Sequence, residues 1–249
     1  AAYYKRFESQ NFPSVNRKFD QPRLPCKEKA KGKTILIWKE QGLGDELMFL
    51  NLAKHFQNIT NCKYIFEGST RLNSLMQRSF PNDQVMDVGY DPNTDSFFTH
   101  AKDYDFHMPY GDFPILLNLE ENHKKVVIPY LKADENLVRK WDRELPKNKV
   151  RIGFSWRSQL NHGVRKLGYT QLGQWEPLLS NPKFSFINLQ YGDIDEDINA
   201  VPTNLSENLF LPKIDLKNEA ESYIYTTEKL VNVDLKDKIS QEQGIKITD

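Results

Sequence analysis

A short glycine loop with an acid at its end is the stretch of this chain best suited to chemistry: Gln41-Gly-Leu-Gly-Asp45. Glycine permits positive φ angles and lets a ligand approach the backbone, and free amides at the start of a helix favour anions. Asp45 can act as a catalytic carboxylate or as a cap that satisfies those amides. The local sequence alone favours the cap and leaves catalysis open. Because the loop is not G-x-G-x-x-G, a dinucleotide-binding fingerprint is absent.

A second polar loop begins at Ser155-Trp156-Arg157 and continues to Arg165 and Lys166. Its hydroxyl and cationic groups follow an apolar run, and guanidinium and ammonium groups are suited to binding a diphosphate. The alternative is a solvated basic loop, which the local sequence alone favours.

A third loop, Gln190-Tyr191-Gly192-Asp193, also follows an apolar run. Tyr191 could stack on a base or a sugar, but turns are the commoner role of such a sequence. The five histidines show no metal-ligand spacing and no Ser-His-Asp set is apparent, so the residues themselves predict no metal site.

The elements that would position these loops alternate between apolar runs and amphipathic stretches. This alternation predicts an α/β fold, with parallel sheets and helices on both faces. Ligands bind such sheets at the carboxyl ends of the strands, where all three loops lie. The predicted strands cover residues 34–38, 62–68, 84–89, 104–111, 150–156, 184–192, 209–216 and 228–235, and the predicted helices cover 45–57, 71–80, 112–121, 134–145 and 170–179.

Capping and breaking residues set the limits of several predicted elements. Asp112 and Asp134 are placed to cap the helices that follow them, and Pro146 ends the second of these helices. Residues 1–32 show little periodicity and are predicted to be an extended segment. The chain ends on GIKITD directly after an apolar run, which predicts further protein beyond Asp249.

Composition restricts the functional class. Lys+Arg and Asp+Glu are equal at 34 each over 249 residues, so the net basic footprint of a non-specific nucleic-acid binder is missing. Neither a membrane-spanning apolar run nor a signal-peptide core is evident. Cys26 and Cys62 are read as free thiols, which indicates a cytoplasmic protein.

Several segments in order carry a resemblance to a known family: FDQPRL, KTILIW with EQGLGDELMF, PYLKADENLVRKWDREL, VRIGFSWRS, and WEPLL with FSFINLQYGD. Together they resemble the glycosyltransferase domain found behind tetratricopeptide repeats in many bacteria, which is similar to the heptosyltransferase group, glycosyltransferase family 9. The match extends over residues 3–198.

The resemblance implies a GT-B architecture. Residues 33–146 would form a Rossmann-like acceptor-side domain, and 147–249 an incomplete donor-side domain with an insertion near 200–240. It implies an inverting, metal-independent transfer from a nucleotide-diphosphate sugar, with no cofactor. The acceptor would be a protein, a lipid-linked glycan or a polysaccharide.

The resemblance also assigns roles to individual residues. Asp45 would be the general base in a loop with Gln41, Gly42 and Gly44, and capping would remain its second role. The donor would lie against the residues of the other two loops: Ser155, Trp156, Arg157, Arg165, Lys166, Gln190 and Tyr191.

Departures from the family pattern keep other functions open. The family's later nucleotide-contacting segment is missing, and so are the repeats, which leaves open an inactive fragment. A non-catalytic scaffold that retains the fold is the main alternative, and another nucleotide-binding enzyme, such as an epimerase, is a weaker one.

Overall fold

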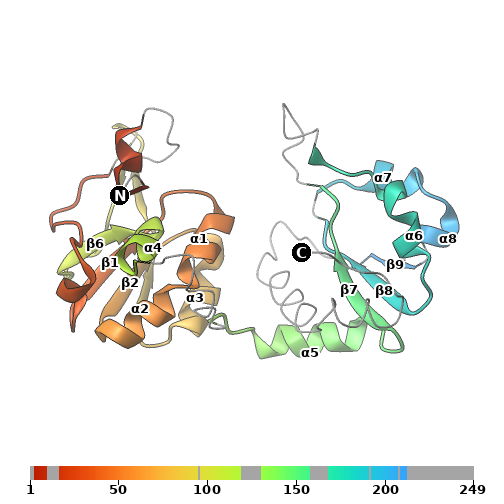
Figure 1. The fold of residues 1–249 in the computed structure, drawn as a ribbon, viewed down its shortest axis with the longest axis horizontal. Coiled ribbons are helices and arrows are strands. Elements are labelled where there is room, and N and C mark those ends of the chain that lie inside the picture. The colour runs from red at the N-terminus through yellow and green to blue at the C-terminus, as the bar shows by residue number, and fades with distance from the viewer. Residues whose placement is uncertain are drawn as a thin grey trace. The chain divides into compact units, whose positions relative to one another are not determined.

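The computed structural model describes residues 3–9, 17–94, 96–118, 130–157, 168–190, 192–206 and 208–211. The chain divides into two compact units, Ala1–Lys132 and Ala133–Asp249 (Figure 1). Helix α5 (Glu135–Glu144) lies in the second unit, whereas the boundaries expected from the sequence place it at the end of the first domain. Trp141 and Leu145 pack against Ile187 and Leu189, which joins α5 to the second unit.

The first unit contains a four-stranded parallel sheet in the order β3-β2-β1-β6, and this confirms the predicted α/β class. The strands are β1 (Thr34–Trp38), β2 (Lys63–Glu67), β3 (Gln84–Met86) and β6 (Phe106–Pro109). The chain passes from β1 to β2 and β3 and then returns to the other side of β1. The topological switch point is therefore at the carboxyl ends of β1 and β6, the usual ligand position in such sheets.

The helices of the first unit follow the strands closely. They are α1 (Leu43–Leu50), α2 (Ala53–Thr60), α3 (Asn73–Ser79) and α4 (Phe113–Leu116), with short 3-10 turns η3 (Thr70–Leu72) and η4 (Tyr110–Asp112). The single helix predicted over 45–57 is divided between α1 and α2. At the break the amide of Leu52 donates to the carbonyl of Phe49, three residues back, which is the tighter 3-10 pattern.

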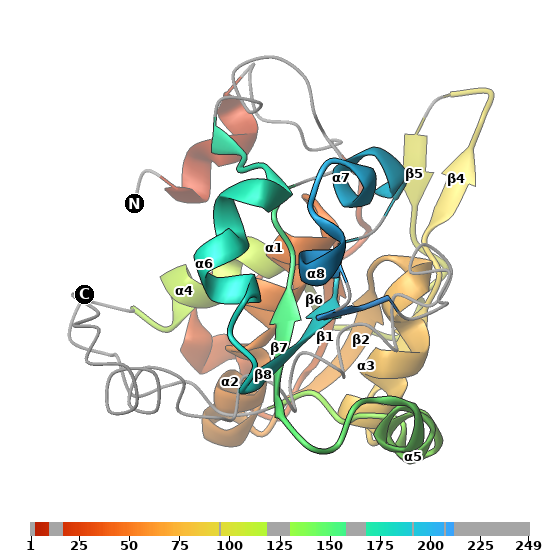
Figure 2. The same cartoon turned by 90° about the vertical axis from the view of Figure 1, so that its right-hand side faces the viewer.

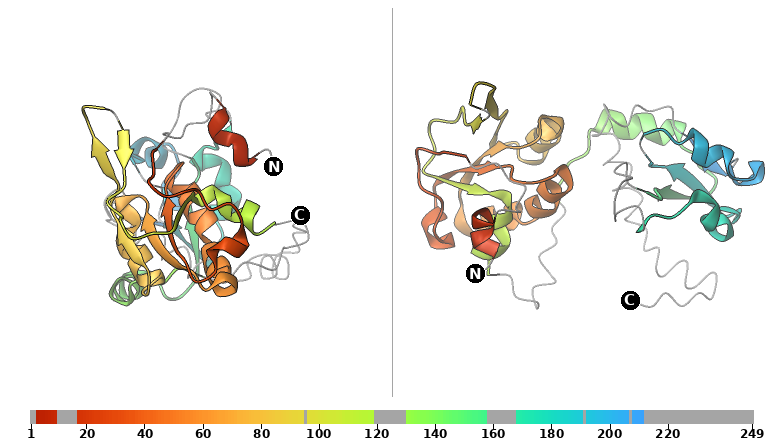
Figure 3. Two further views of the ribbon diagram at one scale, coloured as in Figure 1. Left: turned by 90° about the vertical axis from the view of Figure 1, so that its left-hand side faces the viewer. Right: turned by 90° about the horizontal axis from the view of Figure 1, so that it is seen from above.

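Two local features differ from the sequence prediction. An antiparallel hairpin of β4 (Gly89–Asp91) and β5 (Ser96–Phe98) lies where a polar loop is expected (Figure 3). The N-terminal segment (residues 1–32) is not wholly extended, because it contains the 3-10 helices η1 (Tyr3–Glu8) and η2 (Lys27–Ala30).

The second unit has a three-stranded parallel sheet in the order β7-β8-β9 (Figure 2). Its strands are β7 (Val150–Phe154), β8 (Phe184–Asn188) and β9 (Leu209–Phe210), and its further helices are η6 (Leu172–Trp175), α6 (Glu176–Leu179), α7 (Asp195–Asn199) and α8 (Thr203–Ser206). The predicted cap of α5 is confirmed, because the Asp134 carboxylate accepts from the amides of Asn136 and Leu137.

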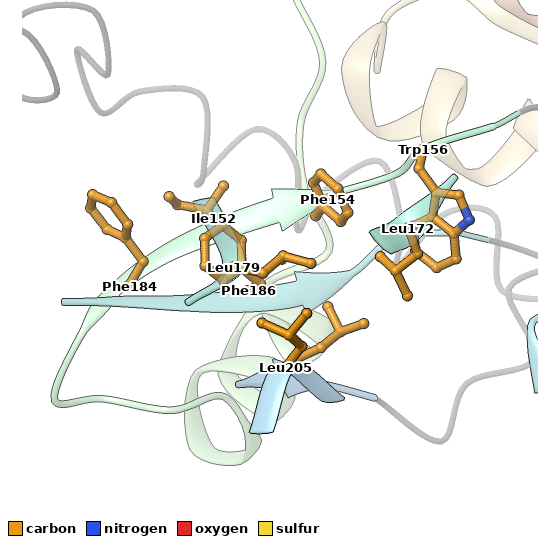
Figure 4. Packing of buried hydrophobic residues seen from close by; sticks show 9 residues of the cluster. Ile152, Phe154, Trp156, Leu172, Leu179, Phe184, Phe186 and Leu205 are labelled. Carbon is orange, nitrogen blue, oxygen red and sulfur yellow. The ribbon is translucent and has the colours of Figure 1, made fainter. Parts of the chain in front are cut away.

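A second apolar cluster, besides the one that joins α5 to β8, supports the strands of the second unit (Figure 4). Ile152, Phe154 and Trp156 alternate along the chain and so share one face of β7 and its extension. Phe184 and Phe186 of β8 pack with them, and the cluster ends with Trp156, just past the carboxyl end of β7. Because Trp156 is packed in this cluster, the chain is held in place where it leaves β7.

Some predicted features lie outside the described residues. They include the strand at 228–235, most of the strand at 209–216, most of the insertion near 200–240 and the last part of the helix at 112–121. Within the described ranges, no helix is long and apolar enough to cross a membrane.

Candidate functional site

Asp45 lies in the first turn of α1, at the carboxyl end of the sheet in the first unit. It is the third helical residue, and its Oδ2 accepts from the amide of Gly42, the N-cap residue, at 3.1 Å. Asp45 thus occupies the acidic position of a capping box. Asp45 is partly exposed. Both roles expected of Asp45, cap and reachable carboxylate, are compatible with this geometry.

The two glycines of the loop do not use the positive φ angles that glycine allows. Gly42 has φ −70°, and among the described glycines Gly32 and Gly192 are those with positive φ. The space beside Gly44 is open, because a Cβ built there meets nothing within 4 Å. Because Gly44 has no side chain and nothing packs beside it, the first turn of α1 is left uncovered at this position.

A buried charge cluster lies directly beside this loop and was not expected from the sequence. Glu40, 5% exposed, accepts from Arg6 Nε at 2.6 Å and from Arg6 Nη2 at 2.9 Å, and from the amide of Gly111 at 2.6 Å. Burial raises the pKa of the Glu40 carboxyl, and the bonds from Arg6 and Gly111 oppose that rise. Burial also opposes the charge of Arg6, but Glu40 and Asp112 outweigh it and raise the pKa of Arg6.

Asp112 extends the cluster across the switch point. Its fully buried carboxylate accepts from Arg6 Nη2 at 3.0 Å and from Arg23 Nη2 and Nε at 2.6 and 2.7 Å. The prediction that Asp112 caps a helix is wrong, because no capping bond forms at the start of α4 and the carboxylate binds two arginines instead. Arg6 and Arg23 thereby attach the N-terminal segment to the turn that follows β6.

The same segment is attached to the edge strand β6. His107 donates its amide to Pro22 and accepts from the amide of Leu24, and its ring stacks on Phe19 at 3.9 Å. Burial, with the nearby Arg23 and Arg17, lowers the pKa of His107 to about 4. His107 is therefore neutral at physiological pH and accepts from Trp38 Nε1 through its Nδ1.

Glu46, the residue after Asp45, is buried on the β2 side of α1 with 2% of its surface exposed. Its carboxylate accepts from the amide of Ser69 at 3.0 Å and from Ser69 Oγ at 2.6 Å. Lys39 Nζ lies 3.5 Å from Glu46 Oε1. The first turn of α1 is therefore bonded to the loop that follows β2.

The packing around Glu46 predicts that Gly68→Ala is destabilising. The added Cβ would lie 2.6 Å from Glu46 Oε2 and 2.9 Å from the Tyr110 hydroxyl, and Glu46 is held in place by Ser69. We expect a loss of about 1–3 kcal/mol in the free energy of unfolding, measured by chemical denaturation. Gly44→Ala is the control, because it meets no atom and helix propensity favours alanine. Equal effects of both substitutions would contradict the packing argument.

In the second unit, Gln190 joins the ends of β7 and β8. Its Oε1 accepts from Ser155 Oγ, from the amide of Trp156 and from the amide of Arg157, at 3.0, 3.3 and 3.0 Å. Gln190 is 1% exposed and Trp156 is 4% exposed. The structure thus brings together four of the predicted donor-side residues. Gln190 holds Ser155, Trp156 and Arg157 in place at the start of the loop that follows β7.

Arg157 is already paired within the described part of the second unit. Its Nε and Nη2 donate to Asp197 Oδ2 at 3.1 and 2.7 Å, and Nη2 donates to the carbonyl of Asp193. A pocket of about 430 Å³ lies here, lined by Arg157, Tyr169, Thr170, Gln171, Asp193, Glu196 and Asp197. The pocket is lined by three carboxylates and one guanidinium. Their charges make it less favourable for binding a diphosphate than the sequence suggests. Arg165, Lys166 and Tyr191 lie outside the described residues.

Sequence reasoning missed the buried charged residues, among them Glu40 and Glu46, which flank the glycine loop in the sequence, and Arg6, which is bonded to Glu40. Charged side chains are mostly exposed, so a pattern of exposed and buried residues assigns them to the surface. The sequence feature that could have identified Glu40 is its position at a strand end, directly before the glycine loop. Its partner Arg6 is 34 residues away in the sequence, and no local pattern links the two.

Comparison with known proteins gives relatives but no family. No protein-family model matches the chain. Protein FlbA of Caulobacter vibrioides is 28% identical over 236 residues, which cover 88% of this chain and 39% of FlbA. A stretch of 37 residues, 15% of this chain, is 97% identical to the chaperone protein DnaK of Nitrosopumilus maritimus and covers 6% of it. The corresponding identity to DnaK of Cenarchaeum symbiosum is 76%.

Among solved structures, the chain is similar to TibC of enterotoxigenic E. coli H10407, a dodecameric, iron-containing glycosyltransferase. The TM-score is 0.40 at 13% identity, over 77% of this chain and 51% of TibC. A structure of TibC as a heptosyltransferase with ADP-D-beta-D-heptose gives a TM-score of 0.36 at 13% identity, over 64% of this chain and 42% of TibC. This chain spans about half of TibC or less, and 39% of FlbA.

The expectation of an enzyme without a metal or cofactor is wrong for TibC, because both TibC structures are described as iron-containing. The expectation assumed that cations beside the diphosphate make a metal unnecessary, and such cations do not preclude a metal elsewhere in a protein. Within the described residues, no group of three or more His, Cys, Asp or Glu side chains could hold a metal ion. The described residues therefore do not fit an iron site.

Proposed function

We propose that this chain belongs to a glycosyltransferase that moves a sugar from a nucleotide-diphosphate sugar to an acceptor hydroxyl. The observation that carries the proposal is the position of Asp45: a partly exposed carboxylate at an uncovered helix start, at the carboxyl edge of a parallel sheet. The resemblance of the surrounding sequence to glycosyltransferase domains supports the same assignment.

The proposed reaction is a single displacement with inversion. The acceptor oxygen attacks the anomeric carbon of the sugar, and Asp45 takes the proton that this oxygen loses. The bond between the anomeric carbon and the diphosphate oxygen breaks, and the nucleoside diphosphate leaves with the electron pair. Asp45 Oδ2 is held by the amide of Gly42, so Oδ1 would be the oxygen that receives the proton.

In this proposal the donor diphosphate lies against the loop that follows β7, where Arg157, Arg165 and Lys166 would balance its charge. Arg157 would have to exchange Asp197 for the phosphate oxygens. The domain would occur beside tetratricopeptide repeats in its full-length protein, in the cytoplasm. The free thiols of Cys26 and Cys62 support a reducing compartment.

Binding of a nucleoside diphosphate tests the donor half of the proposal. With UDP, ADP and GDP as calorimetric probes, we expect one of them to bind this chain. We expect Arg157→Met to weaken that binding by roughly tenfold or more, because a charge-assisted hydrogen bond contributes about 1.5–3 kcal/mol. Arg139→Met is the control, because Arg139 is an exposed arginine on α5 of the same unit. Unchanged affinity in Arg157→Met would remove Arg157 from the site.

A non-catalytic scaffold is the second candidate function. The observation that favours it is the pairing of Arg157 with Asp197 in a pocket lined by acidic groups. Under this reading none of the three diphosphates binds, and none of the corresponding nucleotide sugars is turned over.

A further inference from the structure

Two buried glutamates lie on either side of Asp45 in the sequence, and the proposed reaction uses neither of them. Glu40 comes just before the glycine loop, and Glu46 directly follows Asp45. A buried charge is costly unless it is paired and hydrogen-bonded. Both carboxylates accept hydrogen bonds from nearby groups. The position of these donors in the fold indicates which parts of the chain each glutamate joins.

Glu40 holds the start of the loop toward β6. The amide of Gly111, just past the carboxyl end of β6, donates to Glu40 Oε1 at 2.6 Å. Arg6 donates to both carboxylate oxygens, and it also bonds to Asp112. The side chain of Glu40 is thereby bonded to the turn that follows the neighbouring strand and to the N-terminal segment.

Glu46 holds the first turn of α1 toward β2. Ser69, just past the carboxyl end of β2, donates to it through both its amide and its hydroxyl. Gly68 leaves room for this carboxylate, because a Cβ there would come within 2.6 Å of Oε2. Since β2 and β6 flank β1 on opposite sides, the loop is held from both directions along the sheet.

We propose that Glu40 and Glu46 are positioning residues for Asp45. They fix the two ends of the segment 41–45 to the strands on either side, so that the Asp45 carboxylate keeps one place relative to the acceptor. A general base must be held within about 0.5 Å of its productive position. The assignment rests on the proposed function of Asp45. Arg6, through Glu40, makes the N-terminal segment part of this support.

The first experiment removes the Glu40 support without leaving an unpaired charge. In the double variant Arg6→Met/Glu40→Met, both members of the buried pair become apolar, which is tolerated far better than the loss of one member. We expect the hydrogen-bonded amides within residues 41–46, those of Gly42 and Glu46, to exchange with deuterium at least tenfold faster than in the parent chain. We expect kcat for transfer to fall at least tenfold while the KM for the donor stays unchanged.

Phe56→Leu is the control for general destabilisation, because Phe56 is a fully buried core residue of α2 in the same unit. It should leave exchange at 41–46 and kcat near parent values. Glu46→Gln tests the second support and should accelerate exchange in the same segment. Parent-like exchange at 41–46 in both glutamate variants would overturn the proposal. If the parent chain shows no transfer at all, the proposed function fails, and the exchange rates still decide whether the glutamates order the loop.

Discussion

Replacement of Asp45 by asparagine is expected to lower the transfer rate by about 10²- to 10⁴-fold, the usual contribution of a general base. Asparagine has nearly the same shape, and its carbonyl oxygen can still accept from the amide of Gly42, so the helix start is kept. The amide cannot take a proton from the acceptor hydroxyl. Initial rates with a panel of nucleotide-diphosphate sugars measure the effect.

Asp134→Asn provides the matched control for this substitution. Asp134 caps α5 in the second unit by accepting from the amides of Asn136 and Leu137, and no chemistry is proposed for it. Loss of the charge at a helix start should have a similar small effect on stability in both variants. If Asp45→Asn retains the parent rate, as Asp134→Asn should, then Asp45 is a capping residue and not the base.

The largest effect on stability is expected for Asp112→Asn. The substitution removes the negative charge that faces both Arg6 and Arg23 in a fully buried position. Breaking a buried ion pair by neutralising one partner costs about 3–5 kcal/mol, because the remaining charge stays buried. Chemical denaturation should show this loss in the unfolding of the first unit.

Asp142→Asn provides the comparison at the surface. Asp142 pairs with Arg151 at 3.3 Å, and its side chain is 51% exposed. Exposed pairs contribute about 0–1 kcal/mol, so this variant should unfold almost as the parent does. A similarly small loss for Asp112→Asn would show that the buried cluster contributes little to stability.

The strands around the candidate site could be predicted from the sequence because their signals are local. The run 35–38 is continuously apolar and is followed by a glycine loop, and the structure has β1 followed by α1 at that place. The cap of α5 by Asp134 is equally local. Apolar runs of this kind must be buried on both faces, which favours a parallel sheet.

The support of the site depends on contacts between distant residues and could not be predicted in this way. Arg6 joins Glu40 and Asp112, and Arg17 joins Glu67 at 2.7 Å, although these residues are far apart in the sequence. A short polar residue such as Asp112 before an apolar run has the pattern of a cap. Its burial beside two arginines follows only from the position of the N-terminal segment in the fold.

The distance between Arg6 and Asp112 along the chain also affects the order of folding. The two residues are 106 positions apart, so this ion pair cannot form during synthesis until nearly all of the first unit has been made. Contacts between such distant residues form late, because a long loop must close before they are gained. Arg6, one of the first residues of this unit to leave the ribosome, therefore gains its last partner late. Under the proposed role of Glu40, the ordering of the Asp45 loop would also wait for this stage, because Gly111, which donates to Glu40, directly precedes Asp112 in the sequence.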